Sequence, residues 1–358
     1  MQINFKGILF IGFLILMINQ ELFSENISFE KIDSELIGLQ SEDIISLALD
    51  NNNHLWVGAR NRIIEYDNEN WIDHSEIFEQ IEFLYHPNKS EYNSIFGGNI
   101  YPIDIQVDNN NHIWISTSFG LIEYDHNNWK LNSVEKETPD CFLIDDNRVW
   151  MFSSDTLYLL KDGIWSEYFT IFNGDAKRAI PNTYIFKCYE IHFRMEPIND
   201  DYLLMATTWG LLKFDIKKRK LTNCSPSKQK QPFHNLTIQE EEENIYWLRT
   251  RKGIAKTEFR KFSVDWKFYP KSEIQFSDTD SDRGMIQEVY IAPNKDKWLI
   301  TRITPFGRLY KFDEQYAELI FTLKEVSNKS KKHQINDLII TENNVFFIAT
   351  SNGFYQSK

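Results

Sequence analysis

Two short segments of the sequence carry oxygen- and nitrogen-bearing side chains that could hold a metal ion. Both segments read DNNNH; they begin at Asp50 and Asp108 and end at His54 and His112. Calcium loops need more oxygen ligands at fixed spacing and a closing bidentate glutamate, and neither segment supplies them. Asp and Asn also favour tight turns, because they tolerate left-handed backbone and hydrogen-bond their own main chain. We therefore predict turns here, with no bound metal.

The sequence contains none of the short motifs that mark common catalytic centres. No HExxH or HxH spacing, no GxSxG segment and no glycine-rich phosphate loop occurs. The three cysteines lie far apart without a CxxC pair, so their spacing indicates neither a zinc site nor a disulfide framework. We expect no cofactor and assign no catalytic residue.

Composition and charge restrict the possible partners. The chain has 358 residues, of which 42% are hydrophobic, and a formal net charge of −13. The apolar content suffices for a packed core, and the negative charge argues against binding to nucleic acid or to an anionic membrane surface. The apolar run at residues 7–18 follows Lys6 and has the length of a signal-peptide core. We expect residues 1–24 to be a signal peptide or an uncleaved anchor, and the remaining protein to be periplasmic or secreted.

One long pattern occurs twice in the first third of the chain. Residues 43–71 read DIISLALDNNNHLWVGARNRIIEYDNENW, and residues 104–129 read DIQVDNNNHIWISTSFGLIEYDHNNW. Each copy contains short apolar strands separated by polar turns, and four such strands form one blade of a β-propeller. Self-similarity at this period therefore predicts a repeat fold.

Weaker copies of the pattern continue to the end of the chain, and each copy centres on one large apolar residue in its second strand. These anchor residues are Trp56, Trp114, Trp150, Leu204, Trp247, Trp298 and Phe347. We predict an all-β, seven-bladed β-propeller with four-stranded antiparallel blades, formed by residues 25–358 as a single domain. The repeated tryptophans are expected to be wedges between blades, although stacking on sugars is the alternative.

The two ends of the repeat region complement each other. The last blade ends at Lys358 after its third strand, and residues 28–32 form a spare strand before the first blade. This spare strand can supply the missing outer strand and remove an open sheet edge. We therefore expect the N-terminal strand to close the ring.

The repeats resemble a known family. The pattern D-x-x-x-x-[IL]-W-[IV]-x-T-x-x-G-[IL]-x-x-[FY]-D-x-x-x-W is similar to the two-component regulator propeller repeat, and GLQSEDI at residues 38–44 resembles the linker between its blades. The resemblance implies the extracytoplasmic sensor half of a hybrid histidine kinase, often tied to polysaccharide sensing. This chain differs from that arrangement because no kinase or dimerisation sequence follows the last blade. The resemblance thus supports fold and location more than signalling.

Candidate binding residues lie in the connections that the repeat does not dictate. In a propeller, the connections between second and third strands share a face with the links between blades, and the long insertions at residues 75–100, 169–187 and 270–284 belong to those links. Elaborated loops on one face of a rigid scaffold commonly carry binding. The candidate ligand-binding residues on this face are Arg60, Arg62, Phe119, Trp209, Arg249, Arg251, Lys252, Arg302 and Phe306.

Arginine forks and aromatic faces suit carboxylate- and sulfate-bearing groups. We therefore expect an anionic glycan or an acidic protein segment as the partner, with a separate membrane sensor protein as a further candidate. The competing interpretation is an ordinary solvated rim whose arginines pair with nearby Asp and Glu. The acidic segment Glu240–Glu243 is likewise predicted to be a solvated turn.

The leading hypothesis is a non-enzymatic extracytoplasmic propeller that binds a ligand or a protein as a sensor or interaction module. The first alternative is a lyase or hydrolase that acts on a carbohydrate or a lactone, with Tyr101, His192 and Glu288 able to approach the ring centre. The second alternative is a structural scaffold of an envelope complex.

Overall fold

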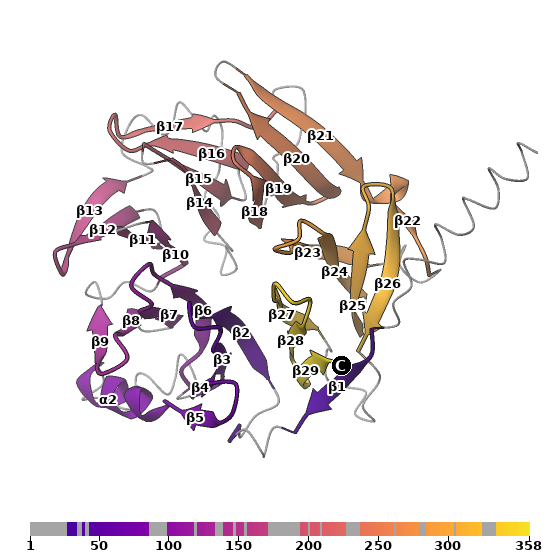
Figure 1. The fold of residues 1–358 in the computed structure, drawn as a ribbon. Coiled ribbons are helices and arrows are strands. Elements are labelled where there is room, and N and C mark those ends of the chain that lie inside the picture. The colour runs from indigo at the N-terminus through magenta and orange to yellow at the C-terminus, as the bar shows by residue number, and fades with distance from the viewer. Residues whose placement is uncertain are drawn as a thin grey trace, which may run out of the picture.

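The strands of the protein form seven sheets around a central axis, as the computed structural model shows (Figure 1). The structure describes residues 27–33, 38–39, 43–85, 99–117, 120–132, 139–145, 148–153, 156–170, 194–199, 201–207, 210–226, 237–260, 263–278, 284–303, 306–323 and 334–358. The predicted seven-bladed propeller is confirmed. The expected signal segment, residues 1–24, lies outside the described residues.

Within each blade the strands pair in antiparallel order from the axis outward. Blades one and two contain β2 (Ile44–Leu49), β3 (Leu55–Ala59), β4 (Arg62–Tyr66), β5 (Trp71–Asp73), β6 (Pro102–Val107), β7 (Ile113–Thr117), β8 (Gly120–Tyr124) and β9 (Trp129–Asn132). Blades three and four contain β10 (Cys141–Asp145), β11 (Arg148–Ser153), β12 (Thr156–Lys161), β13 (Ile164–Thr170), β14 (Arg194–Asn199), β15 (Tyr202–Thr207), β16 (Gly210–Asp215) and β17 (Lys220–Asn223). Blades five and six contain β18 (Ile238–Glu242), β19 (Ile245–Thr250), β20 (Gly253–Phe259), β21 (Val264–Pro270), β23 (Met285–Ile291), β24 (Lys297–Ile303), β25 (Phe306–Phe312) and β26 (Tyr316–Thr322).

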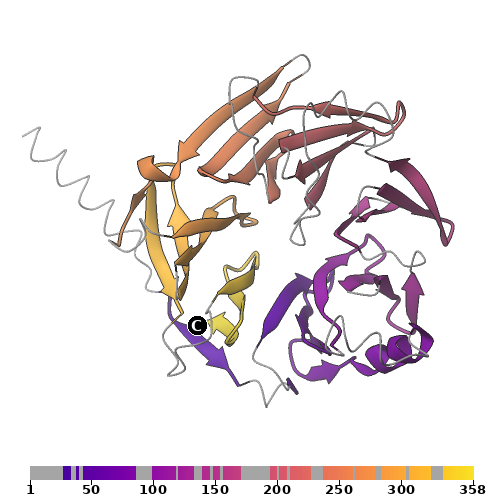
Figure 2. The same cartoon turned by 180° about the vertical axis from the view of Figure 1, so that it is seen from behind.

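Blade seven closes the ring with strands from both ends of the chain. It contains β27 (Ile335–Ile340), β28 (Phe346–Thr350), β29 (Gly353–Ser357) and, as its outer strand, β1 (Phe29–Ile32). β1 pairs antiparallel with β29, with Phe29 opposite Ser357 and Ile32 opposite Phe354. The indigo β1 lies beside the yellow C-terminal strands in both views (Figure 1, Figure 2). The predicted closure by the N-terminal strand is therefore confirmed.

Two links between blades contain regular structure that the sequence did not indicate. Between blades one and two, α2 (Glu76–Tyr85) packs its Ile77 and Phe78 against the apolar side chains of both blades. Between blades five and six, the 3-10 helix η1 (Lys271–Glu273) leads into β22 (Gln275–Phe276), which pairs parallel to β26 and adds a fifth strand to blade six. Among the described residues, no helix has the length and apolar character needed to cross a membrane.

The anchor residues are wedges between blades, as predicted. All seven are buried, with Trp56, Trp150, Leu204 and Trp247 completely inaccessible and Phe347, the most exposed, at 7%. Each anchor belongs to an apolar cluster that joins its own blade to the following one. Trp56, for example, packs with Ile105 and Ile113 of blade two. Burial of 150–250 Å² by one aromatic side chain contributes roughly 4–6 kcal/mol at most. The apolar contacts between neighbouring blades therefore hold the propeller together.

The DNNNH segments are turns, as predicted. In the first segment, Asp50 Oδ1 accepts hydrogen bonds from the backbone N–H groups of Asn52 and His54, both at 2.8 Å. Asn53 adopts the left-handed conformation with a φ of 62°. Asp108 and Asn111 repeat this arrangement in blade two. The two turns lie side by side, because the Asn51 N–H donates to Asn111 Oδ1 at 2.6 Å. We call this side of the ring the turn face.

The opposite side, the link face, carries the connections between blades together with the turns from second to third strands. In blade one, the Asn61 N–H donates to the Ile100 carbonyl at 2.9 Å, and the Ile100 N–H donates to Asn61 Oδ1 at 2.6 Å. In blade five, the Lys271 N–H donates to the Lys252 carbonyl at 2.8 Å. The two kinds of connection share one face, as the sequence predicted.

Candidate functional site

Polar side chains on the innermost strands join neighbouring blades around the axis. Gln106 in β6 donates to the Phe142 carbonyl at 2.9 Å and accepts from the Ile144 N–H at 3.2 Å, so one amide spans the seam to β10. Three further side chains accept a hydrogen bond from a backbone N–H of the next inner strand. These pairs are Gln239 with Ile291, Tyr290 with Ile340 and Asp337 with Leu47. Inner strands are sheet edges, and these side chains satisfy main-chain groups that would otherwise lack a partner.

An axial cavity of about 280 Å³ lies inside this ring of inner strands. Its walls come from the first strands of blades one, two, three, five, six and seven. The polar residues of the lining are Asp104, Gln106, Gln239, Glu288, Tyr290 and Asp337. Apolar side chains such as Leu338 and Phe142 fill the positions between them. This mixture of a few convergent polar groups on apolar walls is typical of a small-molecule site.

Three carboxylates of the cavity occupy equivalent positions in their blades. Asp104, Glu288 and Asp337 each pair with the residue two places after the anchor of the second strand. Each also follows a register shift in its inner strand. Because a bulge re-aims the side chains beside it, the repeat itself turns these carboxylates toward the axis. Carboxylates in this position can accept hydrogen bonds from the hydroxyl or amino groups of a ligand.

Arg249 lies at the edge of this acidic group. It stands in β19 two residues after the anchor Trp247, and it interacts electrostatically with Glu288. Burial lowers the pKa of its guanidinium, and Glu288 acts in the opposite direction. Among the described residues, the buried Nε finds no hydrogen-bond acceptor. A buried guanidinium N–H of this kind can donate a hydrogen bond to an acceptor atom of a bound molecule.

Two of the predicted binding residues, Arg60 and Arg62, lie close to carboxylates, as the competing interpretation of a solvated rim expects. Arg62 pairs with Asp73 at 2.7 Å. Arg60 lies 3.7 Å from Asp43 and covers the ring of Tyr101 at 5.8 Å from its centroid. Blade one therefore neutralises its own arginines.

The predicted cations of blades five and six differ from those of blade one. Arg251 and Lys252 are exposed at the turn between β19 and β20, and Arg302 is half-buried near the end of β24. In the part of the chain that the structure describes, no carboxylate forms an ion pair with these three residues. These three residues place open positive charge on the link face of blades five and six.

The remaining sequence-predicted residues fall into two groups. Phe119 and Trp209 lie outside the described residues, as does His192 of the enzymatic alternative. Phe306 begins β25 and is half-buried, and Tyr101 lies beside Arg60 and not among the cavity-lining residues. Of the residues expected to approach the axis, Glu288 does line the cavity.

Sequence reasoning missed two of the three cavity carboxylates. Asp104 and Asp337 stand in mainly apolar inner strands that read PIDIQV and INDLII. An acidic residue inside such a strand was the signal that could have found them, because a buried carboxylate needs a specific partner.

The prediction of a solvated turn at Glu240–Glu243 is wrong, because Glu240–Glu242 end strand β18 and the side chain of Glu241 is shielded from solvent. The Glu241 carboxylate forms ion pairs with Lys256 at 2.5 Å and Lys297 at 2.7 Å. It also accepts a hydrogen bond from Trp247 Nε1 at 2.9 Å. Burial would raise the pKa of Glu241, but these three donors outweigh it and lower the pKa to about 2. The segment reads as a charge run in sequence, whereas one of its side chains reaches into the seam between blades five and six.

Known proteins share this architecture. The family model described as "Two component regulator propeller" matches residues 38–61, which confirms the sequence resemblance in that segment. The extracellular domain of a B. thetaiotaomicron protein described as a hybrid two component system, BT3049, has a similar fold, with a TM-score of 0.62 and 14% identity over 93% of this chain. The comparison covers 42% of that domain, so this chain spans about two fifths of its length. No curated protein matches the sequence significantly.

Propellers of other kinds also have this fold. A streptogramin B lyase shares it with a TM-score of 0.61 and 9% identity, over 93% of this chain and 98% of the lyase. YCF48 from Cyanidioschyzon merolae shares it with a TM-score of 0.60 and 11% identity, over 92% of this chain and 98% of YCF48. At such identities the likeness establishes the fold and does not distinguish between functions.

Proposed function

We propose that the chain is a non-enzymatic sensing or binding module that works outside the cytoplasm and takes an anionic glycan at its link face and axial cavity. Two findings support the class of protein. Residues 38–61 match the two component regulator propeller, and similar folds occur in extracellular domains of B. thetaiotaomicron two component systems. A separate membrane sensor protein is the partner that would transmit the binding event.

The charges on the link face and those inside the cavity support the ligand class. An acidic sugar carries both an anionic group and several hydroxyl groups. Arg251, Lys252 and Arg302 offer open positive charge for the anionic group. Asp104, Glu288 and Asp337 offer carboxylate oxygens for the hydroxyls. The observation that carries the proposal is the buried Nε of Arg249, which lacks an acceptor among the described residues, in a side chain that interacts electrostatically with the cavity residue Glu288.

The test is a calorimetric titration of the purified protein with uronate-containing and sulfated oligosaccharides, their neutral counterparts and an acidic peptide. We expect binding to an anionic oligosaccharide that weakens at least about tenfold in the R251A/K252A variant, since each charge-assisted hydrogen bond contributes about 1.5–3 kcal/mol. Arg260→Ala is the matched control, because Arg260 is an exposed arginine that already pairs with Glu258 and Asp265.

Three outcomes would contradict the proposal. The first is binding of the acidic peptide alone, which would transfer the site to a protein partner. The second is equal affinity for anionic and neutral sugars. The third is turnover of an oligosaccharide that stops in the Glu288→Gln variant, which would make the chain a lyase or hydrolase with Glu288 as its base.

A further inference from the structure

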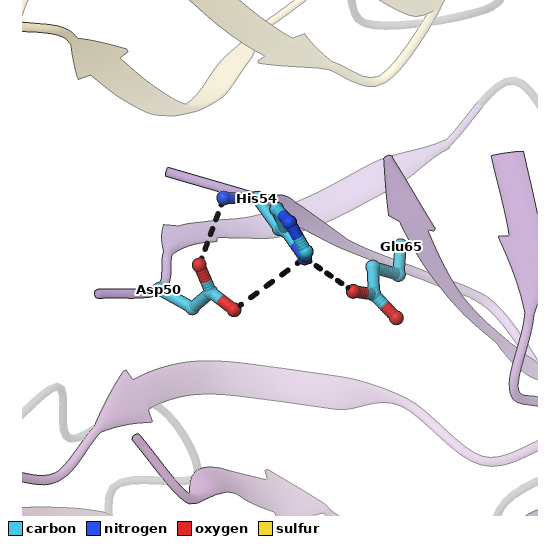
Figure 3. Close-up of side chains that lie close together, drawn as sticks. All are labelled: Asp50, His54 and Glu65. Carbon is cyan, nitrogen blue, oxygen red and sulfur yellow. Dashed lines mark hydrogen bonds and ion pairs between the residues drawn. The ribbon is translucent and has the colours of Figure 1, made fainter. Parts of the chain in front are cut away.

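Asp50, His54 and Glu65 bring three metal-binding side chains together on the turn face of blade one (Figure 3). Asp50 directly follows β2, His54 closes the turn that begins there, and Glu65 points back from β4. His54 Nδ1 lies 2.7 Å from Glu65 Oε1 and 3.7 Å from Asp50 Oδ2. All three ligand atoms lie within 4.8 Å of one another. The sequence motif alone did not show this cluster, because the third ligand comes from another strand.

The structure around the cluster orients one oxygen of each carboxylate toward His54. Asp50 Oδ1 is occupied by two backbone N–H groups of the turn, which leaves Oδ2. Glu65 Oε2 contacts His74 Nε2 at 2.8 Å, which leaves Oε1. His74 is itself fixed by stacking on Trp56, with ring centroids 5.0 Å apart. Outer contacts of this kind hold the ligands of protein metal sites in place.

Burial and charge favour a cation at this point. The Asp50 side chain is inaccessible, Glu65 is 10% exposed, and His54 is 27% exposed, so the cluster is closed behind and open at the histidine. Among the described residues, no lysine or arginine pairs with either carboxylate. Two buried carboxylates close together favour a positive charge beside them.

Blade two provides an internal comparison. It repeats the residue types at the same spacing, with His112 Nδ1 3.4 Å from Asp108 Oδ2 and 3.3 Å from Glu123 Oε1. There, however, Trp114 Nε1 donates to Asp108 Oδ2 at 3.2 Å and occupies the oxygen that a metal would need.

In blade one the corresponding indole does not occupy the ligand oxygen. Trp56 Nε1 is buried and has no hydrogen-bond partner among the described residues. Asp50 Oδ2 instead accepts from Asn111 Nδ2 of the neighbouring turn at 3.3 Å, so the two aspartates differ in the kind of donor and not in its distance. The two blades also differ around the glutamate, because Asn132 and Lys130 contact Glu123 where His74 contacts Glu65. In both blades two carboxylate oxygens face the histidine. Blade one differs because no indole donates to its aspartate and no lysine pairs with its glutamate among the described residues.

We propose that Asp50, His54 and Glu65 bind one zinc ion, with water as the fourth ligand. Zinc bonds of about 2.0–2.2 Å at tetrahedral angles place neighbouring ligand atoms roughly 3.3–3.6 Å apart. The two distances from His54 Nδ1, 2.7 and 3.7 Å, lie on either side of that value. A nitrogen ligand with two carboxylates suits zinc better than calcium or magnesium, which take oxygen ligands in greater number.

The test is calorimetry of the chelator-treated full chain with zinc chloride, supported by the absorption spectrum with cobalt. We expect one ion per chain, a raised unfolding temperature with zinc, loss of binding in His54→Ala, and a 10–100-fold weaker affinity in His74→Ala. His112→Ala is the matched control and keeps the wild-type affinity. Because His54→Ala could unfold, Glu65→Gln is measured beside it, and circular dichroism checks both variants.

Two results would overturn the proposal. One is the absence of zinc binding to the folded wild-type chain, which would leave the cluster as a hydrogen-bond network of imidazoles and carboxylates. The other is zinc binding that survives in a folded His54→Ala or Glu65→Gln variant, since the ion would then be held elsewhere.

Discussion

Blades one and five place opposite charges at the same position of the fold. The residue paired with the anchor from the third strand is Glu65 in blade one and Lys256 in blade five. In blade one this residue contacts His54 and His74. In blade five it contacts Glu241, which Lys297 of blade six also reaches. The repeat fixes where the third-strand side chain lies, whereas its charge is free to vary and gives each seam a different chemistry.

The largest loss of stability should come from removing the tryptophan anchor that each of these two blades contains. Trp56→Ala and Trp247→Ala should each lower the free energy of unfolding by about 3–5 kcal/mol, because each leaves a large cavity in a seam. Urea denaturation followed by circular dichroism measures the loss. Trp129→Ala is the comparison variant and should cost less, since Trp129 at the start of β9 is only half-buried where it packs against the cluster of Trp56. A small loss at either anchor would contradict the wedge role.

The next largest loss of stability should come from removing the two lysines that pair with Glu241 in blade five. Lys256→Met together with Lys297→Met should lower the free energy of unfolding by about 1–3 kcal/mol, because Glu241 keeps only the indole N–H as a donor. The same double substitution in a Glu241→Gln background should cost much less, since no buried charge is left unpaired. Equal losses in the two backgrounds would show that the lysines stabilise blade five through packing alone.

The free energy of unfolding should depend on pH through the carboxylate of Glu241. The pKa of Glu241 is lowered from its ordinary 4.5 to about 2, so its stabilising contribution is complete above about pH 4.5 and is lost as the pH falls toward 2. Wild type should therefore lose its advantage over Glu241→Gln across this interval. Urea titrations at pH 7, 5, 4 and 3 measure the difference. A difference that stays constant with pH would rule out this pKa shift.

The smallest expected effect concerns the amides around the axis. Gln106→Leu should lower the free energy of unfolding by about 1 kcal/mol, because two main-chain groups of β10 lose their partner while the apolar contact is kept. Thermal unfolding detects a change of this size. A stabilised variant would mean that the seam between blades two and three does not need this amide.

The fold could be predicted from the sequence because the repeat is written in local signals. The turn residues of DNNNH, the anchor after each turn and the spare strand at residues 28–32 can each be recognised from a few consecutive residues. Helix α2 and strand β22 could not be predicted, because tertiary packing against neighbouring blades stabilises them.

The candidate site was predictable only in part for the same reason. Arg249 and Glu288 were named from the sequence, but their proximity depends on the seam between blades five and six. Asp104 and Asp337 reach the axis because bulges re-aim them, and a bulge has no sequence signal in these strands. Likewise, Glu65 completes the cluster with His54 from eleven residues away on another strand.

The most direct test of the central claim is a crystal structure of the chain soaked with an anionic oligosaccharide that binds in calorimetry. The account predicts electron density for the sugar in the axial cavity, with its anionic group at Arg251 and Lys252 and its hydroxyls at Glu288 and Asp337. Density on the turn face or along the outer strands, with an empty axial cavity, would contradict it.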